Sequence, residues 1–184
     1  MTKATGVSRR IQQCVVHLQN KDWEGALVNL FPALDQTAKR RRPKDGVGSR
    51  IRAFLEDEEG LISCIAMGNY IAKIEVDDVS ITDALYKFGR TSIAHEGELD
   101  HRLNFNEEGR LVIGQDRWDL PVGYIFGMFI AVIVAHENRD ELIGTELTAT
   151  LFDQRVRIND IWGKRESVRQ LIATKFHRPY LFNH

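Results

Sequence analysis

The sequence predicts a mainly α-helical fold, a helical bundle that carries one or two short β-hairpins. Apolar residues recur at helical spacing through the N-terminal half, while two short stretches further on alternate between apolar and polar residues. An uncharged apolar run, Leu120–Ala135, is typical of a buried helix. With 184 residues, 43% of them hydrophobic and 28% charged, the chain has ordinary globular composition. We therefore expect a single domain over residues 1–184, with a hairpin insertion at about 101–118 and a C-terminal hairpin and helix at about 146–174.

The N-terminal third is expected to form two helices. The first covers about Ser8 to Leu18, and the second begins after Asp22, a suitable N-cap, and ends near Arg40. Pro32 lies inside the second helix, where a proline removes a backbone donor, so we expect a kink or a split there.

A third helix is predicted from Ser49, and the segment 61–76 that follows fits either a helix or an extended strand. Ser80 with Asp83 three residues later resembles a capping box. The helix that it opens should cover Ile81 to Glu96 and stop at Gly97.

Beyond Gly97 the periodicity changes. Residues 101–114 alternate, and 106–109 are predicted as the turn of a hairpin. A buried helix should follow over about 120–137, in which Gly123 and Gly127 permit close helix packing inside the fold or across a dimer. A second hairpin is expected within 147–158, before a last helix at about 160–174.

Charge and cysteine content limit the classes of partner. The formal net charge is −1, so a nucleic acid would have to be met by a local patch. The apolar run 120–135 is shorter than the roughly 20 residues of a membrane-spanning helix, so we expect no membrane partner. Cys14 and Cys64, two thiols in apolar surroundings, indicate a reducing compartment and hence a cytoplasmic protein.

The stretch "GRTSIAHEG", residues 89–97, contains an arginine and a histidine that suit phosphate chemistry. The fork of Arg90 can hold two phosphate oxygens, and a histidine such as His95 can accept and return a proton near neutral pH. On a regular α-helix these two residues point about 140° apart, whereas Thr91 and His95 share a face. Both can therefore act on one ligand only if the arginine reaches around the helix or the helix loosens.

Together with its surroundings, this stretch resembles the HEPN superfamily (higher eukaryotes and prokaryotes nucleotide-binding). The family signature is an arginine, four to six residues, and a histidine on a helix of a small bundle. Its motifs meet at a homodimer interface and form a composite ribonuclease site. The resemblance implies catalytic roles for Arg90 and His95, with Thr91 at the position that often carries Asn, Asp or His.

We therefore expect a metal-independent endoribonuclease without a cofactor that acts on RNA as a homodimer, in the manner of a defence or stress effector. A neutralising or regulatory protein partner would suit such an effector. The alternative is a catalytically inactive HEPN-like module that binds a nucleotide, RNA or a protein. Because "HEGELDH" lacks the His-Glu-x-x-His spacing, a metal hydrolase is the weaker interpretation.

The run of basic residues between positions 39 and 44 is either a solvent-exposed helix end or a surface that binds RNA phosphates. Its members, taken here as RNA-binding candidates, are Lys39, Arg40, Arg41, Arg42 and Lys44.

Overall fold

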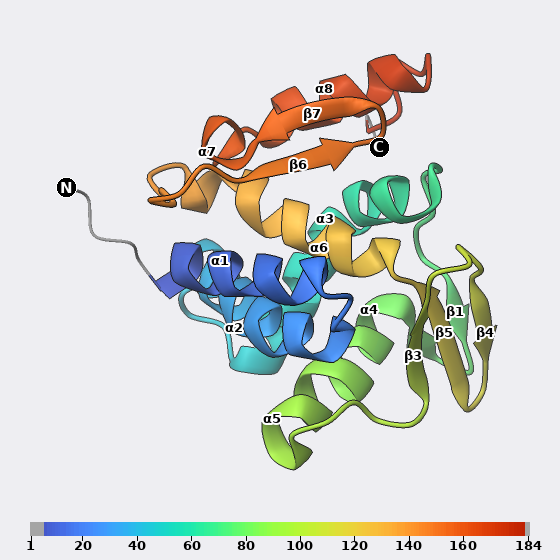
Figure 1. Cartoon of the computed structure of the whole chain (residues 1–184). Helices are drawn as coiled ribbons and strands as arrows, with labels where there is room; N and C mark the ends of the chain where they lie inside the picture. The colour runs from blue at the N-terminus through green and yellow to red at the C-terminus, as the bar shows by residue number, and fades with distance from the viewer. Residues whose placement is uncertain (1–5, 183–184) are drawn as a thin grey trace.

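The centre of the fold is α6, Gly123–Val134, an apolar helix around which the other elements pack. A computed structural model describes residues 6–182. In it α2 (Trp23–Arg41) and α3 (Val47–Met67) lie directly against α6, and small sheets cover the periphery (Figure 1). The fold is mainly α-helical with short strands in small sheets, as the sequence predicts. None of the helices within residues 6–182 combines the length and apolarity needed to cross a membrane.

The first two helices, α1 (Gly6–Gln19) and α2 (Trp23–Arg41), confirm the predicted pair. Asp22 caps α2, because its Oδ1 accepts the Gly25 N–H at 2.9 Å. The expectation of a split at Pro32 is wrong, since α2 continues through it. Proline deprives the carbonyl four residues earlier of its helical partner. That residue is Val28, which is 40% exposed, so water can take the place of the missing donor.

The long helix α3, Val47–Met67, packs against α6 along two glycines. A Cβ on Gly127 would lie 2.7 Å from the Ile62 carbonyl oxygen, and one on Gly123 would lie 2.7 Å from the Ala66 Cα. The interpretation of these glycines as internal packing residues is therefore confirmed.

The segment that the sequence left open divides at Gly68. Helix α3 occupies it as far as Met67, and Gly68 then adopts a left-handed conformation with φ of 66°. A hairpin that the sequence did not predict follows, with strands β1 (Glu75–Val76) and β2 (Val79–Ser80).

Three consecutive helical pieces make up the predicted helix from Ile81 to Glu96, called here the motif helix. They are α4 (Ile81–Ala84), the π-helical η1 (Leu85–Thr91) and α5 (Ser92–Glu96). Ser80 caps the start, because its Oγ accepts the Asp83 N–H at 3.0 Å, and Gly97 ends it at φ 85°. Both predicted ends are confirmed, whereas the π-helical turn was not predicted.

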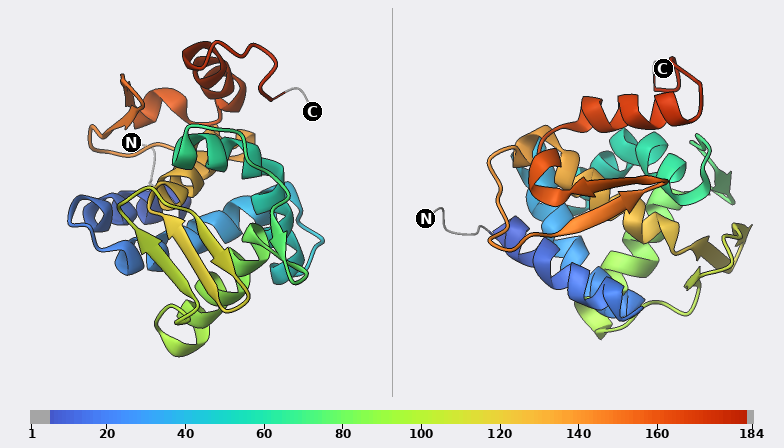
Figure 2. Two further views of the ribbon diagram at one scale, coloured as in Figure 1. Left: turned by 90° about the vertical axis from the view of Figure 1, so that its right-hand side faces the viewer. Right: turned by 45° about the horizontal axis from the view of Figure 1, so that its top comes forward.

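The hairpin predicted with its turn at 106–109 is wrong. Strand β3 (Leu103–Asn106) pairs in parallel with β5 (Arg117–Pro121), and β4 (Val112–Gly114) pairs with β5 in antiparallel fashion. The sheet order is therefore β3-β5-β4, visible in the left view of Figure 2. The Asn106 side chain explains the difference: it accepts the Arg110 N–H at 3.1 Å and donates to the Arg110 carbonyl at 2.7 Å. These bonds close a loop that carries the chain to the other edge of β5.

The C-terminal part begins with the short 3₁₀ helix η2 (His136–Asn138). Next comes the predicted hairpin, confirmed as β6 (Thr148–Leu151) and β7 (Gln154–Arg157). The single last helix expected over 160–174 is wrong, because the chain forms α7 (Ile158–Ile161) and α8 (Arg165–Lys175). Gly163 separates them with φ of 68°, and a Cβ there would lie 2.4 Å from the Arg139 Cβ.

Candidate functional site

The motif helix is anchored to the core by Gly89, directly before Arg90. A Cβ on Gly89 would lie 2.9 Å from the Phe31 Cζ and 3.2 Å from the Leu103 Cδ2. This close approach lets η1 pack directly on α2 and β3. At its far end α5 protrudes at the opposite pole of the molecule from α8 (Figure 1). Gly89 thus fixes the position from which the side chain of Arg90 leaves the core.

Arg90 differs from every other arginine of residues 6–182. It is partly buried, and its side chain has no hydrogen bond, ion pair or ring contact within that range. Each of the other arginines there has such a partner. A guanidinium carries five donors, which are normally satisfied when the side chain leaves bulk water. Among the arginines of residues 6–182, Arg90 is therefore the one whose side-chain donors are left available to a ligand.

The π-helical turn changes the direction of Arg90 relative to His95. A π-helix bonds residue i to i+5, so it has more residues per turn and a smaller rotation per residue than an α-helix. Because η1 extends to Thr91, the offset between the two side chains is less than the 140° of a regular helix. The change is small, because Ser92 to His95 return to the α-helical form, so joint action on one ligand still relies on the reach of the arginine. Such π-helical turns occur frequently at functional sites.

His95 and Thr91 complete the predicted triplet. His95 is exposed on α5, and within residues 6–182 no hydrogen bond or ion pair joins it to Arg90. The Thr91 hydroxyl is buried and lacks a hydrogen-bond partner there. Since a buried hydroxyl without a partner is costly, it is a second polar group in this stretch that the fold leaves unsatisfied.

The loop after the motif helix is held by a compact ion pair that the sequence did not predict. Arg102 donates to both carboxylate oxygens of Asp100, at 2.9 and 2.6 Å, and its guanidinium lies 4.0 Å from the centre of the Phe88 ring. The Asp100 N–H also donates to the Phe88 carbonyl at 3.0 Å. These bonds from Arg102 lower the pKa of Asp100 to about 2. The group, called here the Asp100 lock, ties the loop to η1.

Intramolecular ion pairs occupy the arginines of the basic run. Arg41 contacts Asp57 and Glu58 at 2.9 Å, Arg42 contacts Asp57 at 2.9 Å, and Arg40 contacts Glu141 at 2.8 Å. Lys39 and Lys44 are exposed, without an ion pair in the described part of the chain. RNA binding by this run stays a prediction, and the two lysines are its free cations. The ion pairs give the arginines a structural role, since they link α2 to α3 and to the segment after α6.

One further polar pair was not predicted, because His17 by itself carries no motif. The His17 Nδ1 lies 2.7 Å from the Asp22 Oδ2 across the turn between α1 and α2. The Gly25 N–H and then His17 lower the pKa of Asp22. The signal in the sequence that could have indicated this pair is the five-residue spacing of His17 and Asp22 across the predicted end of the first helix. Gly25 permits the pair, since a Cβ there would lie 2.2 Å from the Asp22 Oδ2.

Over residues 6–182 no group of three or more His, Cys, Asp or Glu side chains is placed to hold a metal ion. Cys14 and Cys64 are buried free thiols.

Comparison with known proteins gives a family match and distant relatives. The model of the Rv1289 family matches residues 6–181. The chain is 24% identical over 183 residues to the uncharacterized protein Rv1289 of Mycobacterium tuberculosis H37Rv, covering 90% of this chain and 87% of the relative. The same values hold for the uncharacterized protein Mb1320 of Mycobacterium bovis. No solved structure matches this chain.

Proposed function

The chain belongs to the Rv1289 family, and from its motif helix we propose that this member is a metal-independent endoribonuclease. The observation that carries the proposal is Arg90, a partly buried arginine without a side-chain partner within residues 6–182. It lies on a π-helical turn five residues before an exposed histidine. A free guanidinium five residues from an imidazole suits a phosphodiester, because the guanidinium supplies positive charge and the imidazole moves protons.

RNA is the phosphodiester that such a sparse site can cleave, because RNA carries its own nucleophile. His95 takes the proton from the 2′-hydroxyl, and the 2′-oxygen attacks the phosphorus. The bond from phosphorus to the 5′-oxygen breaks, and the leaving oxygen receives a proton from a histidine. The products are a 2′,3′-cyclic phosphate and a free 5′-hydroxyl. Arg90 stabilises the negative charge that builds up on the non-bridging oxygens.

Three further groups have roles in this proposal. The buried Thr91 hydroxyl can donate to a phosphate oxygen once substrate is present. Lys39 and Lys44 offer sequence-independent contacts to the RNA backbone. We place the reaction in the cytoplasm, where buried free thiols such as Cys14 and Cys64 stay reduced.

The test is cleavage of varied RNAs by the wild-type protein and by variants of the motif. His95→Ala should lose about 10²- to 10⁴-fold in rate while RNA binding survives, which is the usual contribution of acid–base catalysis. His101→Ala is the matched control, since that nearby imidazole is 89% exposed and should leave the rate unchanged. Arg90→Ala should also lose cleavage, and Arg90→Lys should keep the charge without the fork.

Thr91→Val separates a chemical role from a structural one. Because the hydroxyl has no partner within residues 6–182, its removal should leave the melting temperature unchanged or raise it. A lower cleavage rate in this stable variant would then report contact with the substrate.

Several results would contradict the ribonuclease. DNA should be inert, EDTA should have no effect, and fragments should end in cyclic phosphate. Cleavage that persists in His95→Ala or leaves 5′-phosphate ends would exclude the mechanism. RNA binding without any cleavage by the wild-type protein would instead favour the alternative, an inactive binding module. The observation that favours this inactive module is the absence of a direct contact between Arg90 and His95 within residues 6–182.

A further inference from the structure

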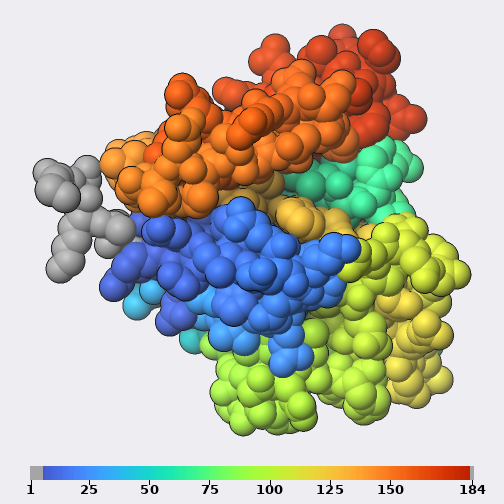
Figure 3. Space-filling model, viewed as in Figure 1, coloured from blue at the N-terminus to red at the C-terminus, as the bar shows by residue number. Residues whose placement is uncertain are grey.

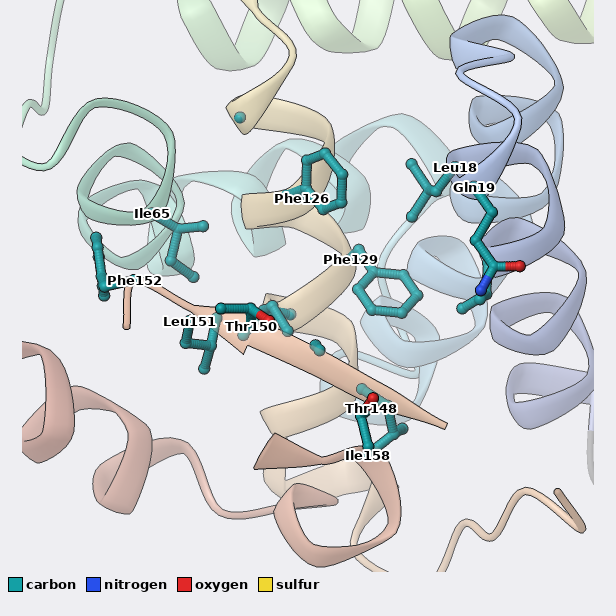
Figure 4. Close-up of a pocket in the computed structure, with 14 residues that line it drawn as sticks. Leu18, Gln19, Ile65, Phe126, Phe129, Thr148, Thr150, Leu151, Phe152 and Ile158 are labelled. Atoms are coloured by element: carbon teal, nitrogen blue, oxygen red, sulfur yellow. The ribbon is translucent and has the colours of Figure 1, made fainter. Parts of the chain in front are cut away.

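A hollow of about 440 Å³ lies between the C-terminal hairpin and the helical core, remote from the motif helix in sequence. Its walls come from α1, α3, α6 and β6, and Phe126 and Phe129 of α6 face β6 across it (Figure 4). None of the fourteen residues that line it carries a charge. In Figure 3 a strip of α6 is visible between the hairpin and α1. The size and the apolar lining are those of small-molecule sites.

One wall of this hollow, called here the apolar cavity, is the free edge of β6. Thr148 and Thr150 are exposed while Ala149 and Leu151 turn inward, yet all four line the cavity. No residue of β7 does so. Successive side chains of a strand point to opposite faces of the sheet, so consecutive residues line the same space when the strand presents its edge to that space. The unpaired edge of the two-stranded sheet therefore faces the cavity.

Among residues 6–182, no strand pairs with the backbone groups on this edge of β6. The Ile158 N–H donates to the Leu147 carbonyl at 2.9 Å, and the register continues with the pair Ala149–Val156. Alternate residues bond across an antiparallel pair, so Thr148 and Thr150 direct their N–H and C=O groups away from β7. The cavity thus combines apolar walls with a few polar groups along one side.

The turn at the end of β6 brings a phenylalanine with an unusual backbone conformation to the cavity. Phe152, which lines the cavity, has φ of 59°, a region that bulky residues rarely adopt. Its ring packs edge-on against Phe176 at 5.1 Å, which holds the conformation. A positive φ at the first residue of a two-residue hairpin loop is the geometry that the tight turn requires. The turn thus places the Phe152 side chain at the cavity.

Charge at the rim determines the class of ligand. The Arg155 Nε donates to the Oγ1 of Thr148, a lining residue, at 3.2 Å. Arg155 is exposed, and it has no carboxylate partner within residues 6–182. On the α1 side the rim carries Gln19, a neutral amide. A ligand that complements this site has an apolar body and an anionic group at the mouth.

We propose that the apolar cavity binds a free amphipathic carboxylate, a medium-chain fatty acid in chemical class. The alkyl chain lies against Phe126 and Phe129, and the carboxylate faces Arg155. The site is separate from Arg90 and His95, so binding does not depend on the ribonuclease proposal.

The test is calorimetric titration of the full chain with hexanoate, octanoate and decanoate, each beside the matching alcohol. Affinity should rise about fourfold for each methylene until the cavity is full. Each carboxylate should bind more tightly than its alcohol. Trp23 provides an optical signal, because its ring lies 6.4 Å from that of Phe126.

Variants locate the ligand. Phe126→Ser removes an exposed apolar wall of the cavity and should lower the affinity for decanoate about tenfold. Ala149→Phe fills the cavity and should lower that affinity by a similar factor. Val112→Ser on β4, a residue exposed like Phe126, is the control that should change nothing. Arg155→Gln should lower the affinity for decanoate about two- to fivefold, which corresponds to the strength of an exposed ion pair. The affinity for decanol should stay unchanged. Arg157→Gln, two residues along β7 and paired with Asp160, should have no effect.

The proposal is overturned by any of four results. Decanoate and decanol could bind equally, the folded Phe126 and Ala149 variants could bind as the wild type does, or no binding could appear at millimolar decanoate. Binding to phosphatidylglycerol vesicles without binding to free decanoate would also overturn it, because a membrane would then be the occupant.

Discussion

Glu58 is fully buried on α3 and meets guanidinium groups from two other helices. Its Oε1 lies 2.9 Å from Arg41 of α2, and its Oε2 lies 3.2 Å from Arg165 of α8. Burial raises the pKa of Glu58, and the guanidinium groups oppose that shift. A buried carboxylate with such partners connects three helices through charge, so its removal takes a counter-charge from guanidinium groups that are only 13% and 28% exposed.

We expect Glu58→Gln to lower the free energy of unfolding by about 3–5 kcal/mol, the usual cost of breaking a buried ion pair from one side. Urea denaturation followed by circular dichroism measures it. Glu56→Gln, two residues earlier on the same helix and exposed, should stay within about 0.5 kcal/mol of the wild type. Equal stability of the two variants would mean that the network contributes nothing.

The motif helix is the element on which the proposed chemistry depends, and it is fixed at both ends. Ser80 caps its start, and the Asp100 lock holds the loop beyond its end to Phe88. Between these points the π-helical turn carries Arg90. Rigid ends with an irregular middle keep two side chains in place that a regular helix would turn further apart.

The Asp100 lock should make stability depend on pH. The folded-state pKa of Asp100, about 2, lies below the unfolded value of about 4. The ionised form is therefore favoured by folding, so this contribution is present above the unfolded pKa and is lost as pH falls toward 2. Asp100→Asn should cost about 1 kcal/mol at neutral pH, and this cost should shrink as pH falls from about 4 through 2.

Urea denaturation at a series of pH values tests this expectation, and Asp140→Asn is the control because Asp140 is 90% exposed. A constant difference between Asp100→Asn and the wild type from pH 7 to pH 2 would show that the effect is not ionic.

At the scale of the whole molecule, α5 and the cavity lie apart. The tip of the motif helix projects at one pole, whereas the hairpin β6–β7 covers the other side of α6 (Figures 1 and 2). An exposed helix tip with unpartnered polar groups suits a two-fold contact, which would bring two arginines and two histidines to one cleft. The homodimer remains a prediction of the proposed ribonuclease.

Light scattering should give the mass of a dimer at micromolar concentration. If the site is composite, a mixture of Arg90→Ala and His95→Ala chains should regain cleavage, because each mixed dimer combines an arginine from one chain with a histidine from the other. Mixing Arg90→Ala with the double variant Arg90→Ala, His95→Ala is the control that should stay inactive. A monomeric mass, or a mixture as inactive as its components, would contradict the composite site.

Local patterns in the sequence predicted much of the fold and part of the site. The Asp22 and Ser80 caps, the stop at Gly97 and the β6–β7 hairpin follow from chemistry within a few residues, and each was confirmed. The hairpin predicted at 106–109 was wrong because β3 pairs with β5 in parallel. The alternation of apolar and polar residues within a segment does not show which other segment it pairs with. The Asn106 side chain also donates to the Asp119 carboxylate of β5 at 2.8 Å, a bond that exists only once the sheet has formed.

The sequence by itself determined the helical class of this protein, the ends of the motif helix, and which residues have the chemistry for phosphate. Only the tertiary structure decided which of those groups are free. Arg40, Arg41 and Arg42 look alike in sequence, yet folding brings carboxylates from distant segments to all three, while Arg90 receives none within residues 6–182. The physical reason is that a cap or a turn is satisfied by its neighbours in the chain. The partner of a long charged side chain, and the empty space beside a strand edge, depend on how distant elements pack.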